Sequence, residues 1–216
     1  MIADINANTF DTGVDELERF ALEECTKRQR LDHPVAAMVM PASDCELAIK
    51  LARLGARIAA VDRPAKREMI EANILASGLN SQISYAAMEL PGVADELPDE
   101  PYDMIFIRYG LEHLAYEDAR STIRQLMKKL RIGGKLYVSI LGLKSELGDG
   151  YADAEKSVEE RFSHLAPAMV KKYGIKSKVC LYSERNLFLM LIGAGASVLR
   201  TLTTTYGNVK AVAVKV

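Results

Sequence analysis

The sequence has little of what marks disulfide-rich or metal-binding proteins. Its 216 residues include no tryptophan, three histidines and three cysteines. Cys25, Cys45 and Cys180 are odd in number and widely spaced, which fits neither a disulfide framework nor a paired-cysteine zinc site. We therefore expect a reducing compartment and no metal site.

Long runs of apolar residues or of basic residues are also missing. No stretch of about 18 apolar residues occurs, and the N-terminal segment carries acids where a signal peptide would be apolar. The formal net charge is −1, and without a long Lys/Arg run there is no reason to expect a phosphate-backbone partner. The sequence thus predicts a cytoplasmic protein without membrane or nucleic-acid partners.

The composition is that of one globular domain, with 49% hydrophobic and 26% charged residues. Apolar residues at helical spacing over 14–31 predict an amphipathic N-terminal helix. Exposed apolar positions on this helix would allow a homodimer without requiring one. We expect a helical flank over 1–33 and one domain over 34–216.

Short apolar runs alternate with helical patterns from residue 35 onward. Gly55 and Gly78 follow two of these helices, where a left-handed cap is favoured, and Pro64 suits a first helical position. The alternation predicts right-handed βαβ units and a parallel sheet. The expected strands are 35–40, 57–61, 82–87, 104–109 and 135–141, the last after a Gly133-Gly134 turn, and the expected helices are 44–54, 64–77 and 117–130.

Residues 143–181 break this rhythm and are interpreted as an insertion over the sheet. Within it we expect a helix carrying Val158, Phe162, Leu165 and Met169 on one stripe, interrupted near Pro167 and ended by Gly174. The chain then closes with a helix over 184–191 and two strands, 196–205 and 209–216. Their three-residue link is so short that they must form an antiparallel hairpin.

Four segments resemble successive motifs of class I S-adenosylmethionine-dependent methyltransferases. They are ELAIKLARLGARIAAVD (46–62), PYDMIFIRYGLEHL (101–114), LMKKLRIGGKLYVSI (126–140) and LFLMLIGAGASVLR (187–200). The resemblance implies an α/β fold with a doubly wound, seven-stranded, mainly parallel sheet and an antiparallel C-terminal hairpin. It also implies S-adenosylmethionine as cofactor and a small-molecule methyl acceptor.

In such a sheet, ligands lie at the carboxyl ends of the strands. By resemblance, Asp62 would bind the ribose hydroxyls, although capping the helix that follows is an alternative. Arg63 would flank the adenine, or begin the helix as a solvated charge. Ala87 and Met88 would lie at the adenine edge, where Ala86 replaces the family's usual acid.

The segment after the fourth expected strand would meet the methionine part of the cofactor and the reacting methyl group. The resemblance places Arg108 and Tyr109 there, with a solvated strand-end charge as the alternative for Arg108. His113 has a pKa type suited to removing a proton from an acceptor, although a structural capping role is its alternative. Tyr109 and His113 are the candidate catalytic residues.

The family's glycine-rich cofactor loop is absent. Val39 stands where the family has an acid, and Pro41, Ser43 and Cys45 stand where it has glycines, which allow close backbone approach. Pro41, Ala42 and Ser43 would still line the cofactor. The Ser43-Asp44-Cys45-Glu46 segment also has the form of a capping box, which would satisfy the helix amides internally.

Three functions stay open at this point. The first is methyl transfer to a small molecule, and the second is a catalytically inactive methyltransferase-like domain that binds or scaffolds. An open crevice beside the loop favours the first, and a crevice filled by Pro41, Ser43 and Cys45 favours the second. The third, a nicotinamide-dependent oxidoreductase, requires a G-x-G-x-x-G loop that is lacking.

The insertion is the expected acceptor lid, because connections at the carboxyl ends of strands carry specificity. Its candidate contact residues are Tyr151, Arg161, His164 and Lys171.

Overall fold

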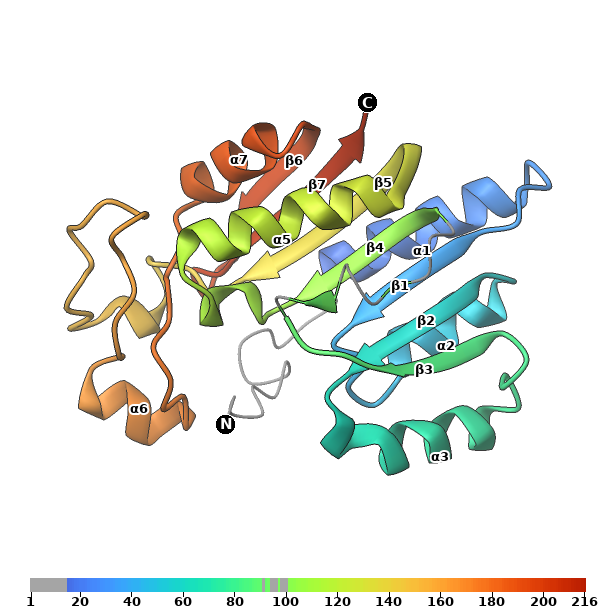
Figure 1. Cartoon of the computed structure of the whole chain (residues 1–216), viewed down its shortest axis with the longest axis horizontal. Helices are drawn as coiled ribbons and strands as arrows, with labels where there is room; N and C mark the ends of the chain where they lie inside the picture. Colours follow the sequence, from blue (N-terminus) through green and yellow to red (C-terminus); the bar gives the residue numbers. More distant parts are fainter. Residues whose placement is uncertain (1–14, 91, 94–96, 98–100) are drawn as a thin grey trace.

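The computed structural model describes residues 15–90, 92–93, 97 and 101–216. They form a seven-stranded sheet with the order β3-β2-β1-β4-β5-β7-β6 (Figure 1). The first five strands in this order are parallel, and β7 pairs antiparallel with both β5 and β6. The strands are β1 (Ala36–Met40), β2 (Arg57–Asp62), β3 (Ile83–Ala87), β4 (Tyr102–Arg108), β5 (Leu130–Ile140), β6 (Ala196–Thr203) and β7 (Val209–Lys215).

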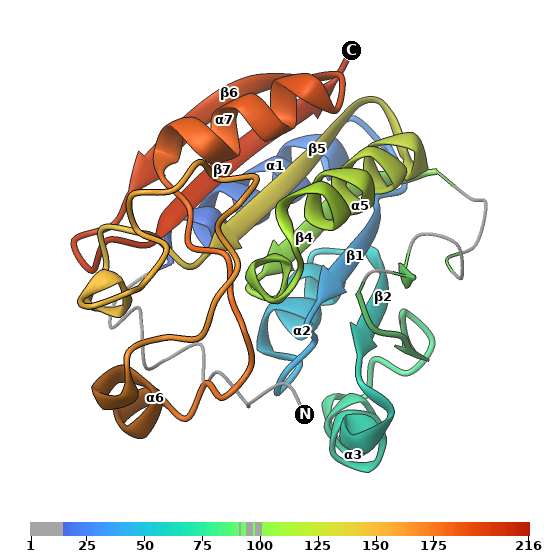
Figure 2. The ribbon, with the colours of Figure 1, turned by 60° about the vertical axis from the view of Figure 1, so that its left-hand side comes forward.

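Helices cover both faces of the sheet, because the central strands are apolar on both sides. In β1, Met38 faces the core beneath α5 and α7, whereas Ala37 and Val39 face the core beneath α1, α2 and α3. Figures 1 and 2 show α5 and α7 on one face, with α1 and α2 on the other. The helix bounds are α1 (Glu16–Gln29), α2 (Glu46–Arg53), α3 (Arg67–Ser77), α5 (Tyr116–Lys129) and α7 (Glu184–Gly193).

The predicted fold class is confirmed, including the antiparallel hairpin formed by β6 and β7. The N-terminal helix begins at Glu16, and residue 14 lies outside the described residues. The predicted turn at Gly133-Gly134 is wrong, because β5 begins earlier, at Leu130. The pairing jumps from Tyr102 with Leu130 to Met104 with Lys135, so the glycines belong to a bulge within the strand.

The insertion also differs from its predicted form. The chain makes turns between residues 151 and 166, so the helix expected over Val158–Leu165 is wrong. A short helix, α6 (Pro167–Tyr173), begins at the proline that was expected to interrupt one, since a first helical position needs no N–H donor. Arg161, which is buried, donates instead to the carbonyl oxygens of Lys156 and Leu181, and this contact holds the turns.

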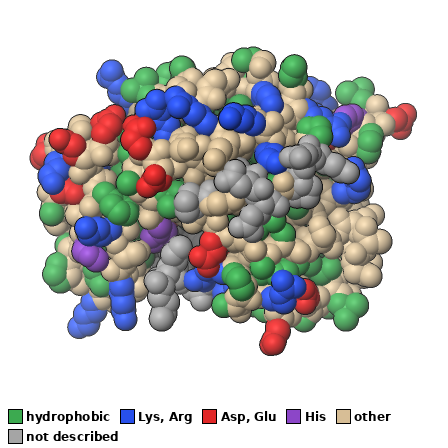
Figure 3. Space-filling model, in the orientation of Figure 1, with side chains coloured by type: hydrophobic (Ala, Val, Ile, Leu, Met, Phe, Trp, Pro, Cys, Tyr) green, Lys and Arg blue, Asp and Glu red, His purple; other side chains and the backbone are tan. Residues whose placement is uncertain are grey.

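The surface carries both signs of charge. In Figure 3, acidic side chains gather at the upper left of the visible face, over part of the insertion, and Lys and Arg side chains lie across the whole face. Among the described helices, none combines the length and apolarity that crossing a membrane requires.

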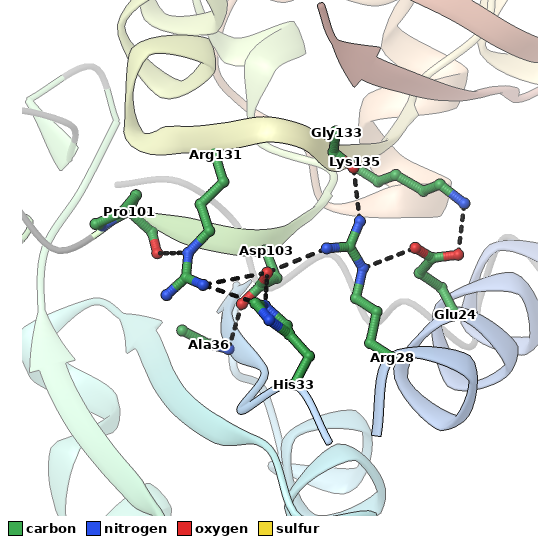
Figure 4. A network of polar contacts seen from close by, with 9 residues as sticks. All are labelled: Glu24, Arg28, His33, Ala36, Pro101, Asp103, Arg131, Gly133 and Lys135. Atoms are coloured by element: carbon green, nitrogen blue, oxygen red, sulfur yellow. Dashed lines mark hydrogen bonds and ion pairs between the residues drawn. The ribbon is translucent and has the colours of Figure 1, made fainter. Parts of the chain in front are cut away.

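A buried carboxylate ties α1 to the amino ends of the strands (Figure 4). Asp103, at 0% exposure, accepts from Arg28 Nη1 at 3.1 Å and from the Ala36 amide at 2.9 Å. His33 Nε2 lies 2.6 Å from the same carboxylate. Arg28 extends the network by donating to the Gly133 carbonyl. The side chains of Asp103 and Arg28 therefore together join α1, β1, β4 and β5.

We predict that Asp103→Asn lowers the free energy of unfolding by about 3 kcal/mol, because an amide would turn a donor toward a partly buried arginine or a buried backbone amide. Urea denaturation measures the change. The control is Glu71→Gln, whose exposed ion pair with Arg67 spans one helical turn and should change stability by less than about 0.5 kcal/mol. Equal effects of the two substitutions would contradict the prediction.

Candidate functional site

A cavity of about 660 Å³ opens at the carboxyl ends of β1, β2 and β4. Strand order reverses between β1 and β4, which is where open α/β sheets bind ligands. The arrowheads of these strands point toward the side of α6 in Figure 1. The wall includes nine of the ten predicted site residues: Pro41, Ala42, Ser43, Asp62, Arg63, Met88, Arg108, Tyr109 and His113.

The loop between β1 and α2 adopts backbone conformations that are typical of glycine, although it contains no glycine. Ser43 has φ of +51° and Cys45 has φ of +66°, in the left-handed region that non-glycine residues seldom adopt. The amide of Cys45 donates to the Ala42 carbonyl at 2.7 Å, and the amide of Ala42 donates to Val61 in β2 at 2.8 Å. The loop therefore keeps a tight path despite the side chains that replace glycine.

The predicted capping box is wrong. Cys45 is the N-cap residue of α2 and makes no side-chain cap bond. The backbone turn at Ser43 leaves its side chain exposed, and the Glu46 amide donates to Asp44 Oδ1 at 3.2 Å instead.

The loop leaves the cavity open. Cys45, at 0% exposure, points into the core between α2 and the sheet, and burial raises the pKa of its thiol to about 11. Pro41, Ala42 and Ser43 line the wall without closing it. An open crevice is the arrangement that we expected to favour methyl transfer over an inactive domain.

Asp62 joins the loop to the end of β2. Its Oδ2 accepts from the Ser43 amide at 2.9 Å, and its Oδ1 accepts from the Arg63 amide at 2.8 Å. The alternative role as helix cap is wrong, because Arg63 is the N-cap of the turn Pro64–Lys66 and Asp62 precedes it. Each carboxylate oxygen keeps a second lone pair, so this buried side chain can still accept from a ligand in the cavity that it lines.

The segment after β3 continues the same wall. The Met88 amide donates to the Asp62 carbonyl at 3.1 Å, which places the Met88 side chain beside the cavity. Ala87 pairs with Asp62 in the sheet but does not line the cavity. Of the predicted pair, Met88 alone is positioned to contact a ligand there.

Arg108 lines the cavity, yet its guanidinium is held by α1. Nη2 donates to Asp15 Oδ2 and lies 3.5 Å from Glu18 Oε2. Lys210, at 2% exposure, donates to Asp15 Oδ1 at 3.2 Å. Burial opposes ionisation of Asp15, but the charges of Arg108 and Lys210 hold its pKa below the ordinary value. The first turn of α1 is therefore part of the site.

Tyr109 and His113 form the opposite wall. Tyr109 has φ of +57°, and its hydroxyl accepts from Asn208 Nδ2 at 3.4 Å. The His113 side chain is 3% exposed, and its Nδ1 lies 2.9 Å from Ser177 Oγ. Burial, with a smaller contribution from Arg63, lowers the pKa of His113 to about 4, so the imidazole is neutral at pH 7.

Comparisons with known proteins agree with this fold. Residues 42–138 match the family model of a methyltransferase domain. An S-adenosylmethionine-dependent methyltransferase from Clostridium acetobutylicum superposes with a TM-score of 0.68 at 12% identity, covering 98% of this chain and 96% of that one. The chain has the fold of class I methyltransferases, and within it residues 42–138 resemble a methyltransferase domain.

Other solved structures of this superfamily fold are longer. An O-methyltransferase family protein from Burkholderia thailandensis has a TM-score of 0.62 at 14% identity, covering 97% of this chain and 59% of that chain. The structure of PigF with SAH has a TM-score of 0.61 at 16% identity, with 92% and 56% covered. This chain thus spans little more than half of both. A search of curated proteins found no match.

The sequence did not indicate two contributors to this cavity. Glu18 comes from α1, which was expected to be a flank, and Ser177 comes from the insertion. The insertion residues predicted to contact an acceptor do not line the cavity; they are Tyr151, Arg161, His164 and Lys171. Ser177 lies on the inward side of its segment, because buried Ile175 and Val179 alternate with exposed Lys176 and Lys178. This period-two pattern is the sequence signal that could have identified Ser177 as a lining residue.

We predict that Ser43→Gly raises the free energy of unfolding by about 0.5 kcal/mol, because relief of left-handed strain exceeds the added chain entropy. Chemical denaturation tests this. Ser197→Gly on β6, where Ser197 is also exposed, should instead lower stability by about 0.5–1 kcal/mol. The prediction fails if Ser43→Gly is destabilising as well.

Beside His113, burial raises the pKa of Glu112 to about 7, although the Gly110 amide donates to its carboxylate. Its ordinary value is 4.5, so the unfolded chain binds fewer protons between these pH values. Stability contributed by the neutral acid is therefore lost as pH rises through about 7.

We compare the free energy of unfolding of Glu112→Gln with that of the unmodified protein. We predict that this difference shifts in favour of the variant by about 2 kcal/mol from pH 5 to pH 8. The amide keeps an acceptor for Gly110 and cannot ionise. Denaturation at both pH values measures the difference, and the opposite contribution of His113 is common to both proteins. A difference independent of pH would contradict the assigned burial effect.

Proposed function

We propose that this chain transfers the methyl group of S-adenosylmethionine to a small-molecule acceptor. The observation that carries the proposal is the open cavity at the carboxyl ends of β1, β2 and β4, with Asp62 in its wall. When bound, the cofactor supplies a methyl group on a sulfonium whose leaving group is S-adenosylhomocysteine. The chain's residues bind, orient and exclude water around it.

The residues of the cofactor side fit this group. Asp62 has free lone pairs for ribose hydroxyls, and Met88 offers an apolar surface for adenine. Glu18, Asp44 and Glu46 add negative charge to the wall, which favours the cationic sulfonium and ammonium groups. The same charges oppose a pyrophosphate, which supports this cofactor over a dinucleotide.

Arg108 was expected to meet the methionine part of the cofactor. Because Asp15 and Glu18 already engage its Nη2, we propose that it orders the first turn of α1 against the cavity and contacts the methionine part only from that position. Tyr109 and His113 then belong to the acceptor side.

The inactive scaffold alternative rests on the missing acid and glycines. It requires loop side chains to fill the crevice, whereas Cys45 is buried away from it and the wall stays open. This supports an active enzyme. A cytoplasmic location is also part of the proposal, because Cys25, Cys45 and Cys180 are all free and buried.

Calorimetric titration with S-adenosylhomocysteine tests the proposal. We expect micromolar binding and a loss of at least about tenfold in Asp62→Asn, since one acceptor becomes a donor facing the ribose. Glu71→Gln on the outer side of α3 should bind like the unmodified protein, and thermal melts would show that all three are folded. Absence of binding at millimolar ligand would overturn the proposal.

A further inference from the structure

The insertion places one hydroxyl against His113. Residues 175–181 follow α6 and pass the turn that holds Glu112 and His113, and the Cys180 amide donates to the Glu112 carbonyl at 2.8 Å. Val179 is fixed in turn by a bridge to Ser163, with its amide 2.9 Å from the Ser163 carbonyl. These backbone contacts set Ser177 at the cavity wall.

Neither ring nitrogen of His113 is open to the cavity. Nδ1 lies 2.9 Å from Ser177 Oγ. Nε2 is buried, makes no hydrogen bond to any described residue, and lies 3.9 Å from Glu112 Oε1. A direct contact between an acceptor and the imidazole is therefore blocked, and the Ser177 hydroxyl is the polar group that a ligand meets on this side.

The environment of each nitrogen selects the tautomer. The Glu112 carboxyl group lies 3.9 Å from Nε2 and offers an acceptor oxygen on that side, so Nε2 carries the proton. Nδ1 then holds a lone pair and accepts from the Ser177 hydroxyl. The oxygen of that hydroxyl keeps its own lone pairs for a donor in the cavity.

We propose that Ser177 and His113 form a proton-accepting pair that selects a hydroxyl-bearing methyl acceptor. As the acceptor oxygen bonds to the methyl carbon and the carbon–sulfur bond breaks, its proton passes to Ser177 Oγ. The Ser177 proton passes to His113 Nδ1, and Glu112 faces the resulting imidazolium. This inference rests on the proposed function for its acceptor half, whereas the tautomer is a property of the chain alone.

Nitrogen NMR of the labelled full chain tests the pair without any acceptor turnover. His113→Gln identifies the His113 signals among three histidines. We expect Nε2 to be protonated and Nδ1 to be an acceptor whose resonance moves in Ser177→Ala and returns in Ser177→Thr. Ser163→Ala, in the same insertion, should leave it unchanged. A protonated Nδ1, or no response to Ser177→Ala, would overturn the pair.

Phenol and anisole, added to the protein with S-adenosylhomocysteine, test the acceptor half. Phenol should shift the His113 nitrogen signals in the unmodified protein and not in Ser177→Ala. Anisole, which has no hydroxyl proton, should leave these signals unchanged in both proteins. Equal responses to both probes, or none to phenol while S-adenosylhomocysteine binds, would overturn hydroxyl selection. Absence of S-adenosylhomocysteine binding would instead count against the proposed function and leave the tautomer result standing.

Discussion

The carboxylate of Asp62 is the contact on which the rest of the site depends. It accepts from backbone amides on both sides, Ser43 in the loop and Arg63 after β2, and therefore fixes the distance between two strand ends. With this anchor, left-handed conformations at Ser43 and Cys45 are retained although neither residue is glycine. The crevice survives a change of loop sequence because the surrounding bonds determine the loop's path.

The first helix is joined to the sheet at both of its ends. Near its C-terminus, Arg28 reaches the buried carboxylate of Asp103. At its N-terminus, Asp15 caps the helix and binds Arg108 and Lys210. A helix that covers one face of the sheet thereby also completes the cavity wall, and the charges at that end balance each other instead of facing solvent.

Most of the fold could be predicted from the sequence, because alternating apolar runs and helical patterns follow from burial on both faces of a sheet. Local chemistry was less readable. The S-x-x-E pattern at Ser43 suggested a cap, but the Ser43 amide donates to Asp62, a residue distant in sequence, and the Glu46 amide donates to Asp44. The stripe from Val158 to Met169 suggested one helix, but Arg161 satisfies the carbonyls of turns and the helix begins only at Pro167. Ser177 was missed because its partner, His113, lies 64 residues away in sequence.

The most direct measurement is a crystal structure of the chain with S-adenosylhomocysteine. The account predicts ribose hydroxyls on Asp62, with the amides of Ser43 and Arg63 still bound to that carboxylate and the loop still left-handed at Ser43 and Cys45. A ligand bound elsewhere, or a loop that must rearrange before the ribose reaches Asp62, would contradict the claim that the backbone preserves the cofactor crevice without its glycines.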